Sequence, residues 1–184
     1  MDLLEFEKRI GVTFLDKDLL KQAFVHRSYL NENRSIKLPH NERLEFLGDA
    51  VLELIVTEYL YHKYPERQEG DLTSYRAALV NAVTLSSVAD SLNFNDYLLL
   101  SKGEAKDTGR ARQSILADTL EAVIGAIYID QGYDIAKEFI SENILNLIEG
   151  IVAKGAWIDA KSLFQEAAQE KTGVTPSYKT LKET

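Results

Sequence analysis

The stretch NERLEFLGDAVL, residues 41 to 52, decides how this sequence is interpreted. Its Leu, Phe, Ala and Val residues predict a buried helix, and yet it carries Glu42, Glu45 and Asp49. At about 100° of rotation per residue these acids share a narrow face, which continues into apolar positions farther along the helix. Ionised carboxylates are costly in a dry core without partners. The stretch therefore predicts a functional site, and a charged surface stripe is the alternative.

A second apolar stretch, SILADTLEAVIGAIYI at residues 114 to 129, repeats the anomaly. Asp118 and Glu121 are its only charged residues, and their spacing of three places them on one helix face. Gly125 follows on that same face and leaves room for another helix to approach closely. We therefore expect pairs of carboxylates from two helices to converge.

Four converging carboxylates without basic partners require cations, because leaving them ionised and unpaired is unfavourable. All-oxygen ligands select hard cations, and Mg²⁺ or Mn²⁺ is favoured where a site also accepts phosphates. A buried cluster of carboxyl groups that share protons is the alternative. Di-iron bundles require Glu-x-x-His pairs, and His26, His40 and His62 are too scattered to supply them. Metal ions held by carboxylates suggest phosphodiester cleavage without a protein nucleophile.

Composition limits the remaining classes of protein. No apolar run approaches the roughly 20 residues that cross a bilayer, so no membrane partner is expected. The N-terminus is acidic and amphipathic, which is not typical of a secretory signal. The sequence has no cysteine, which excludes disulfides and fits a reducing, cytoplasmic location. The net charge of −8 argues against nucleic-acid binding by overall field, although cations in an acidic site reverse its local sign.

Apolar residues recur at helical spacing through most of the chain, which predicts an all-α domain at residues 1–150. A linker is expected at residues 151–157, where the lone Trp follows a long amphipathic helix. Residues 158–184 predict a helix that stops at Gly173 and the start of a strand, and they are too few to bury a core. The candidate helices of the domain are residues 2–10, 16–24, 42–63, 71–80, 82–92, 95–99, 113–131 and 133–154.

Taken together, these motifs resemble the ribonuclease III family of double-stranded-RNA endonucleases. NERLEFLGDAVL closely resembles the signature helix of that family. FVHRSYLNE at 24–32, QEGDLTSYRAALVN at 68–81 and SILADTLEAVIGAIYID at 114–130 are similar to further family motifs in the same order. The resemblance implies a ribonuclease III-type helical nuclease domain over residues 1–150. Residues 158–184 resemble the first helix and strand of an α+β double-stranded-RNA-binding domain, which would be incomplete.

The resemblance implies hydrolysis of phosphodiesters in double-stranded RNA that depends on Mg²⁺, with Mn²⁺ as a possible substitute. The products would carry 5′-phosphate and 3′-hydroxyl ends with a short 3′ overhang. The implied substrates are ribosomal and messenger RNA precursors. By position, the metal-binding catalytic acids would be Glu45, Asp49, Asp118 and Glu121, with Glu121 the most critical, and the further acids of the catalytic valley would be Glu42 and Glu69.

Members of this family pair two nuclease domains into one valley, so the resemblance also implies a homodimer. Phe46 matches the aromatic residue that enters the partner subunit, and it lies on a mixed face of its helix. Packing under a helix of its own chain is the alternative. The loop SKGEAKDTGRARQ is expected to face RNA, whereas a solvated loop is the ordinary interpretation of such a charged run. Its candidate RNA-binding residues are Lys102, Lys106, Arg110 and Arg112.

Two functions from other classes are weighed against this one. A catalytically inactive relative that binds RNA or acts as a ribonucleoprotein scaffold should lose acids from the cluster, and all four are present. A helical carboxylate protein with unrelated metal or redox chemistry should supply His ligands, which the spacing does not provide. An incomplete RNA-binding domain would weaken affinity more than chemistry, so we expect cleavage that is retained but sensitive to salt.

Overall fold

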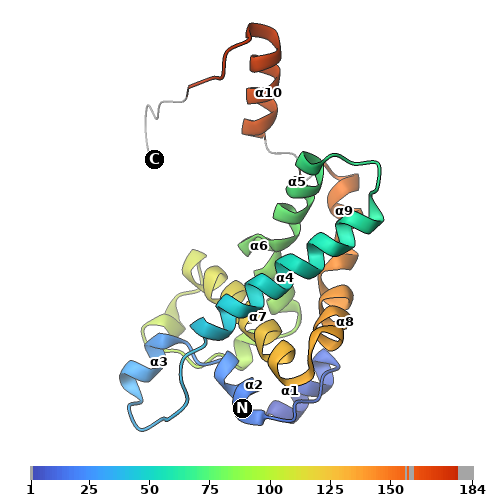
Figure 1. Ribbon diagram of the computed structural model, residues 1–184. Helices are drawn as coiled ribbons and strands as arrows, with labels where there is room; N and C mark the ends of the chain where they lie inside the picture. The colour runs from blue at the N-terminus through green and yellow to red at the C-terminus, as the bar shows by residue number, and fades with distance from the viewer. Residues whose placement is uncertain (1, 156, 158–159, 178–184) are drawn as a thin grey trace.

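The computed structural model describes residues 2–155, 157 and 160–177, and the regular secondary structure of these residues is helical (Figure 1). They contain no sheet, and one isolated parallel bridge joins Val25 to Leu99. The all-α prediction is therefore confirmed. No helix in this part of the chain has the length and apolarity needed to cross a bilayer.

The helices are α1 (Leu3–Ile10), α2 (Lys17–Ala23), α3 (Arg27–Glu32), α4 (Glu42–Lys63), α5 (Glu69–Val80), α6 (Ala82–Ser91), α7 (Arg110–Gln131), α8 (Tyr133–Asn143), α9 (Ile148–Ala153) and α10 (Ala160–Thr172), with 3₁₀ turns η1 (Phe94–Asp96), η2 (Glu104–Lys106) and η3 (Leu145–Leu147).

The long helices α4 and α7 form the centre of the protein (Figure 1). From Ile115 to Ile127, every residue of α7 is buried except Asp118 and Glu121, which are half-buried. This helix is surrounded by α2, α4, α6 and α8, so its apolar residues point in all directions. The two acids are thus the only charged groups on the buried part of the central helix.

A pair of glycines allows α4 and α7 to cross closely. A Cβ atom added to Gly48 would lie 1.7 Å from the carbonyl oxygen of Glu121, and one added to Gly125 would lie 2.2 Å from that of Leu44. Both distances are far below van der Waals contact, so neither position can accept a side chain unless the helices separate. The close approach predicted at Gly125 is confirmed, and Gly48 is its partner on α4.

The start of α4 is fixed by Asn41, which is buried. The backbone N–H of Asn41 donates to the carbonyl oxygen of Val25 at 2.9 Å, and its side-chain amide donates to that of Ala23 at 3.2 Å. Beneath this segment the rings of Phe6 and Phe24 pack edge to face, 4.9 Å apart. These contacts hold the first turn of α4 against the N-terminal helices.

The boundaries differ from the predicted ones where a segment lacks a clear apolar period. Helix α3 was not predicted, because its six residues include no buried one. The helix predicted at 95–99 is only the turn η1, and the one predicted at 133–154 is divided into α8, η3 and α9.

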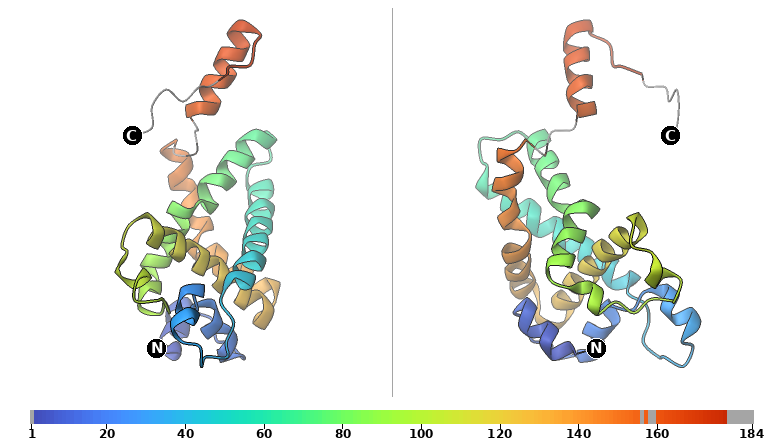
Figure 2. Two further views of the ribbon diagram at one scale, coloured as in Figure 1. Left: turned by 90° about the vertical axis from the view of Figure 1, so that its left-hand side faces the viewer. Right: turned by 180° about the vertical axis from the view of Figure 1, so that it is seen from behind.

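The tail contains α10, which ends before Gly173 as predicted. Gly173 has a φ of +70°, the left-handed conformation that favours glycine after a helix. The predicted strand falls mainly on residues 178–184, outside the described residues, and residues 174–177 form none. Trp157 packs against Tyr75 of α5 with ring centroids 4.9 Å apart. Figure 2 shows α10 projecting away from the other helices.

Candidate functional site

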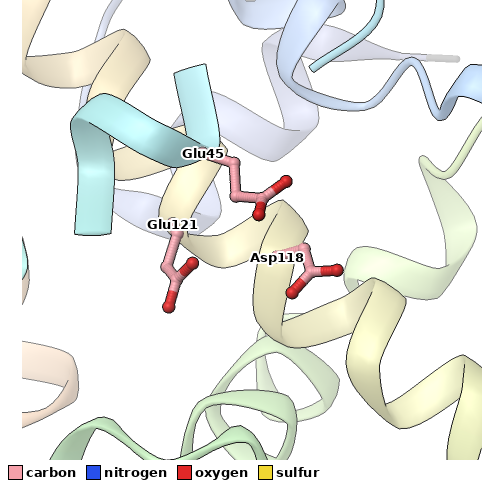
Figure 3. Close-up of side chains that lie close together, drawn as sticks. All are labelled: Glu45, Asp118 and Glu121. Carbon is pink, nitrogen blue, oxygen red and sulfur yellow. The ribbon is translucent and has the colours of Figure 1, made fainter. Parts of the chain in front are cut away.

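Three of the four predicted acids converge where α4 crosses α7 (Figure 3). Glu45 from α4 and Asp118 and Glu121 from α7 each place a carboxylate oxygen within 4.8 Å of the other two. Oxygens bound to one Mg²⁺ at about 2.1 Å lie up to about 4.2 Å apart. Oxygens that lie within 4.8 Å of one another need only small side-chain movements to meet that limit, so the three side chains can form a ligand set. The helix crossing at the two glycines produces this placement.

The acidic cluster, defined as Glu45, Asp118 and Glu121, carries perturbed pKa values. Burial, together with the charges of Asp49 and Asp118, raises the pKa of Glu121 to about 8. Burial also raises the pKa of Glu45, with repulsion from Asp118 next in size. The pKa of Asp118 is raised by burial, and only nearby His26 opposes this shift. The carboxyl groups therefore lack sufficient compensating charge from the protein.

The donor set fits a hard divalent cation. No ion pair within the described part of the chain includes a member of the acidic cluster. Carboxylates that are desolvated and repel one another are stabilised by a bound cation, which reverses the local sign of charge. Oxygen ligands alone favour Mg²⁺ or Mn²⁺ over softer metals. Sharing of protons remains the metal-free alternative, since the raised pKa of Glu121 favours its protonated form at neutral pH.

Asp49 lies at the rim of the acidic cluster. It is one helical turn after Glu45 on α4 and is exposed, and it is not among the three groups whose oxygens lie within 4.8 Å of one another. After burial, however, its charge is the largest cause of the raised pKa of Glu121. The structure thus places the fourth predicted acid beside the cluster and more open to solvent.

The two acids predicted to line the valley lie outside the cluster. Glu42 has Oε1 at 3.2 Å from Nε of Arg27 and Oε2 at 3.7 Å from Nδ1 of His40, so its charge has a basic partner. Glu69 begins α5 and accepts a hydrogen bond from the Thr73 hydroxyl at 3.0 Å. Neither residue is part of the acidic cluster, although Glu42 adds to the rise in the pKa of Glu45 that burial and Asp118 mainly cause.

The charged loop presents Lys102 and Lys106, and the first turn of α7 presents Arg110, all three exposed. Arg112 differs, because it is half-buried and its Nη1 and Nη2 donate to Asn95 Oδ1 and the Glu104 carbonyl oxygen at 3.0 and 2.9 Å. Arg112 therefore holds the loop against α7, and the other three side chains are the accessible cations.

Phe46 is 81% exposed. The alternative prediction for this side chain, that it packs under a helix of its own chain, is therefore wrong. Leu54 and Tyr61 are also exposed and lie on the same side of α4 by helical spacing. Tyr61 borders a cavity of about 460 Å³ that is also lined by Leu60 and Leu72. The exposed apolar stripe, defined as Phe46, Leu54 and Tyr61, is unusual for a surface helix.

Sequence reasoning missed Gly48 as a determinant of the site. The sequence did contain an indication of its role. A glycine inside a helix that runs from Glu42 to Lys63 is unfavourable unless close packing requires it. Gly48 lies three positions after Glu45, which places both on the side of α4 that faces α7.

Comparison with known proteins agrees with this geometry. The Ribonuclease-III-like family model matches residues 16–148. Ribonuclease 3 of Enterococcus faecalis is 48% identical over 182 residues, covering 97% of this chain and 77% of that protein. Ribonuclease 3 of Treponema denticola is 44% identical, covering 98% of this chain and 73% of the relative.

Solved structures also show similarity to ribonuclease III proteins. The nuclease domain of ribonuclease III from Campylobacter jejuni superposes with a TM-score of 0.70 at 44% identity, covering 81% of this chain and 97% of that one. Dicer from Pichia stipitis superposes with a TM-score of 0.57 at 27% identity, covering 92% of this chain and 75% of that one. With the family model and the relatives agreeing over the helices that carry the acidic cluster, the chain belongs to the ribonuclease III family of endoribonucleases.

Proposed function

We propose that the protein cleaves double-stranded RNA by metal-dependent hydrolysis in the cytoplasm, processing ribosomal and messenger RNA precursors. The products carry 5′-phosphate and 3′-hydroxyl ends with a short 3′ overhang. The observation that carries this proposal is the acidic cluster, in which Glu45, Asp118 and Glu121 meet without an ion-pair partner in the described residues. The family membership supports it, because the relatives are named for this nuclease activity.

In this proposal Glu45, Asp49, Asp118 and Glu121 hold Mg²⁺, with Mn²⁺ as a substitute. When bound, the metal activates water and stabilises the leaving oxygen of a phosphodiester. The carboxylates come from two helices locked together at their crossing, so their separation is fixed before the substrate arrives. Half-burial limits the access of bulk water on the protein side. The exposed Asp49 lies where a phosphate group can enter.

RNA binding is assigned to the exposed cations of the loop before α7, because the net charge of −8 cannot attract a polyanion by itself. Lys102, Lys106 and Arg110 are free to contact phosphates. Residues 1–150 form the proposed nuclease domain and residues 151–157 a linker, although α9 extends to Ala153. Residues 158–184 are proposed to begin an RNA-binding domain.

The proposal is tested by incubating the protein with a long RNA duplex and Mg²⁺. We expect duplex cleavage that stops in EDTA and resumes with Mg²⁺, and products whose ends are 5′-phosphates. A single strand of the same sequence serves as the control and should remain intact. Cleavage that persists in EDTA, or that consumes both RNAs at one rate, would contradict the proposed mechanism.

The raised pKa of Glu121 predicts how the metal-free protein responds to pH. Between the ordinary value of 4.5 and the folded value of about 8, the folded state keeps a proton that the unfolded chain has lost. The free energy of unfolding therefore falls as pH rises through this window. Mg²⁺ binds the deprotonated carboxylates, so it should raise Tm more at pH 8 than at pH 6. Thermal unfolding in EDTA, in Mg²⁺ and in KCl of equal ionic strength measures both effects, and a Tm indifferent to Mg²⁺ at every pH would exclude the metal site.

We also propose that two copies pair through the exposed apolar stripe of α4. The solved domain of Campylobacter jejuni ribonuclease III is described as having a region involved in dimer formation, which supports pairing in this family. In such a dimer, Phe46 enters the partner subunit and loses its 81% exposure. Glu42 and Glu69 then line a valley shared by the two subunits.

Phe46→Ala is expected to weaken dimerisation by about 100-fold or more, because burying an aromatic anchor contributes several kcal/mol at an interface. Analytical ultracentrifugation over a concentration series measures the change. Leu15→Ala is the matched control, since Leu15 is 83% exposed and does not lie on α4. A parent protein that sediments as a monomer, or equal losses in both variants, would contradict the proposed interface.

A further inference from the structure

The base of the charged loop lies along the segment that leads into α3. The backbone N–H of Leu99 donates to the Phe24 carbonyl oxygen at 2.9 Å, and the N–H of His26 donates to the Leu99 carbonyl oxygen at 3.1 Å. These bonds form the parallel bridge between Val25 and Leu99. The chain that enters the loop is therefore aligned with the first turn of α3.

Beyond the bridge, two side chains of α3 bind the backbone of the charged loop. The Ser28 hydroxyl oxygen accepts from the backbone N–H of Ser101 at 3.0 Å, and Glu32 Oε2 accepts from that of Lys102 at 3.1 Å. Ser28 and Glu32 are four residues apart on one face of α3, and they bind two consecutive amides of the loop. A helix of six residues with no buried member thus gains two contacts to a segment about 70 residues away in sequence.

The Ser28 hydroxyl is oriented by His26, the residue that caps α3. The Nδ1 atom of His26 accepts from the backbone N–H of Ser28 at 3.3 Å, as it does in the tautomer that is protonated on Nε2. The same Nδ1 lies 2.8 Å from the Ser28 hydroxyl and accepts its hydrogen. The lone pairs of the Ser28 oxygen are then directed to the Ser101 amide.

The same segment is also bonded to the start of α4, the helix that carries Glu45 of the acidic cluster. The Asn41 N–H donates to Val25, which joins the segment to the first turn of α4. On the other side, His26 is near enough to Asp118 of α7 to offset part of the rise that burial causes in the pKa of that carboxyl group. One short segment therefore bonds to the loop and to the start of α4, and it lies near Asp118 of α7.

We propose that α3 is a clamp that fixes the loop cations at a set distance from the acidic cluster, with Ser28 and Glu32 as positioning residues for duplex RNA. The proposal rests on the proposed function, because it takes Lys102 and Lys106 as RNA contacts. Ordering the loop before binding reduces the entropy lost when the duplex is bound. Breaking the clamp should therefore affect RNA binding more than the hydrolytic step.

The test compares two double variants that differ only in their hydrogen-bonding capacity at the clamp. S28A with E32A removes both acceptors, whereas S28T with E32Q retains a hydroxyl and a carbonyl oxygen at the same positions. Hydrogen exchange over residues 99–109 reports on the loop. Polarisation of a labelled RNA duplex in EDTA reports on binding without cleavage. Steady-state cleavage in Mg²⁺ separates KM from kcat, and the Tm shift with Mg²⁺ alone reports on the metal site.

For the Ala pair we expect faster exchange across the loop, duplex binding weaker by about tenfold and a KM raised to match, because two ordinary hydrogen bonds shift an equilibrium by roughly that factor. The kcat should stay within about twofold and the Mg²⁺ shift should be unchanged. The Thr and Gln pair should behave like the parent. Unchanged exchange, unchanged duplex binding, a lost Mg²⁺ shift, or failure of the Thr and Gln pair to restore the parent values would each overturn the clamp. If the parent itself does not cut duplex RNA, the proposed function fails, and exchange and binding still decide the clamp.

Discussion

Glu121→Gln is expected to lower the kcat for duplex RNA cleavage by at least about 1,000-fold. The neutral amide has nearly the shape of the carboxylate but cannot supply an anionic oxygen to a cation, and a metal ion contributes several kcal/mol to such a reaction, at 1.36 kcal/mol per tenfold in rate. Glu121 comes from the central helix and has the largest pKa shift of the cluster, to about 8. Single-turnover cleavage with saturating protein measures the loss.

The same substitution should leave folding intact. Removing a carboxyl group that is destabilised by burial and by Asp49 should make the metal-free protein at least as stable as the parent above pH 8. Activity and stability would then change in opposite directions, which distinguishes a lost ligand from a damaged fold. Glu138→Gln on α8 is the control, because Glu138 is exposed and is not a member of the acidic cluster. Equal cutting by the Glu121 variant and the parent would remove Glu121 from the mechanism.

Gly48→Ala is expected to destabilise the protein by at least about 3 kcal/mol, the upper range for overpacking a core. The added Cβ would lie 1.7 Å from the Glu121 carbonyl oxygen, and this atom belongs to the backbone of a buried helix that cannot move aside. Separation of α4 from α7 would also pull Glu45 away from the two acids of α7. Urea unfolding followed by circular dichroism measures the stability, and the Tm shift with Mg²⁺ should be lost.

Gly70→Ala in α5 is the matched control for this substitution. A Cβ at Gly70 meets no atom within 4 Å, so the change should be neutral or stabilising by up to about 1 kcal/mol through helix propensity. If Gly48→Ala were as stable as the parent and still responded to Mg²⁺, the close crossing would not be what assembles the acidic cluster.

Several features of the site were predictable because they depend on positions within one helix. The period of 3.6 residues places Asp118, Glu121 and Gly125 on one face of α7 whatever that helix packs against. The same period explains why the six residues of α3 were missed, since a segment of that length shows no period. The clamp formed by Ser28 was therefore not visible in the sequence.

Contacts between elements were less predictable, because helix packing determines which side chains meet. Glu42 and Glu45 lie on the same face of one helix, and yet Glu42 pairs with Arg27 while Glu45 joins the acids of α7. Lys102, Lys106 and Arg112 carry the same charge, but the first two are exposed, whereas the Arg112 side chain donates to Asn95 and to the Glu104 carbonyl oxygen of the loop.

The sequence by itself determined an all-α domain, two helices with acidic faces and a glycine suited to a close crossing, because helical periodicity is a local property of the chain. Only the tertiary structure decided that three acids meet while Asp49 stays at the rim, and that Gly48 and Gly125 face one another. The physical reason is that the distance and angle between helices depend on the fit of their side chains, which no single segment specifies.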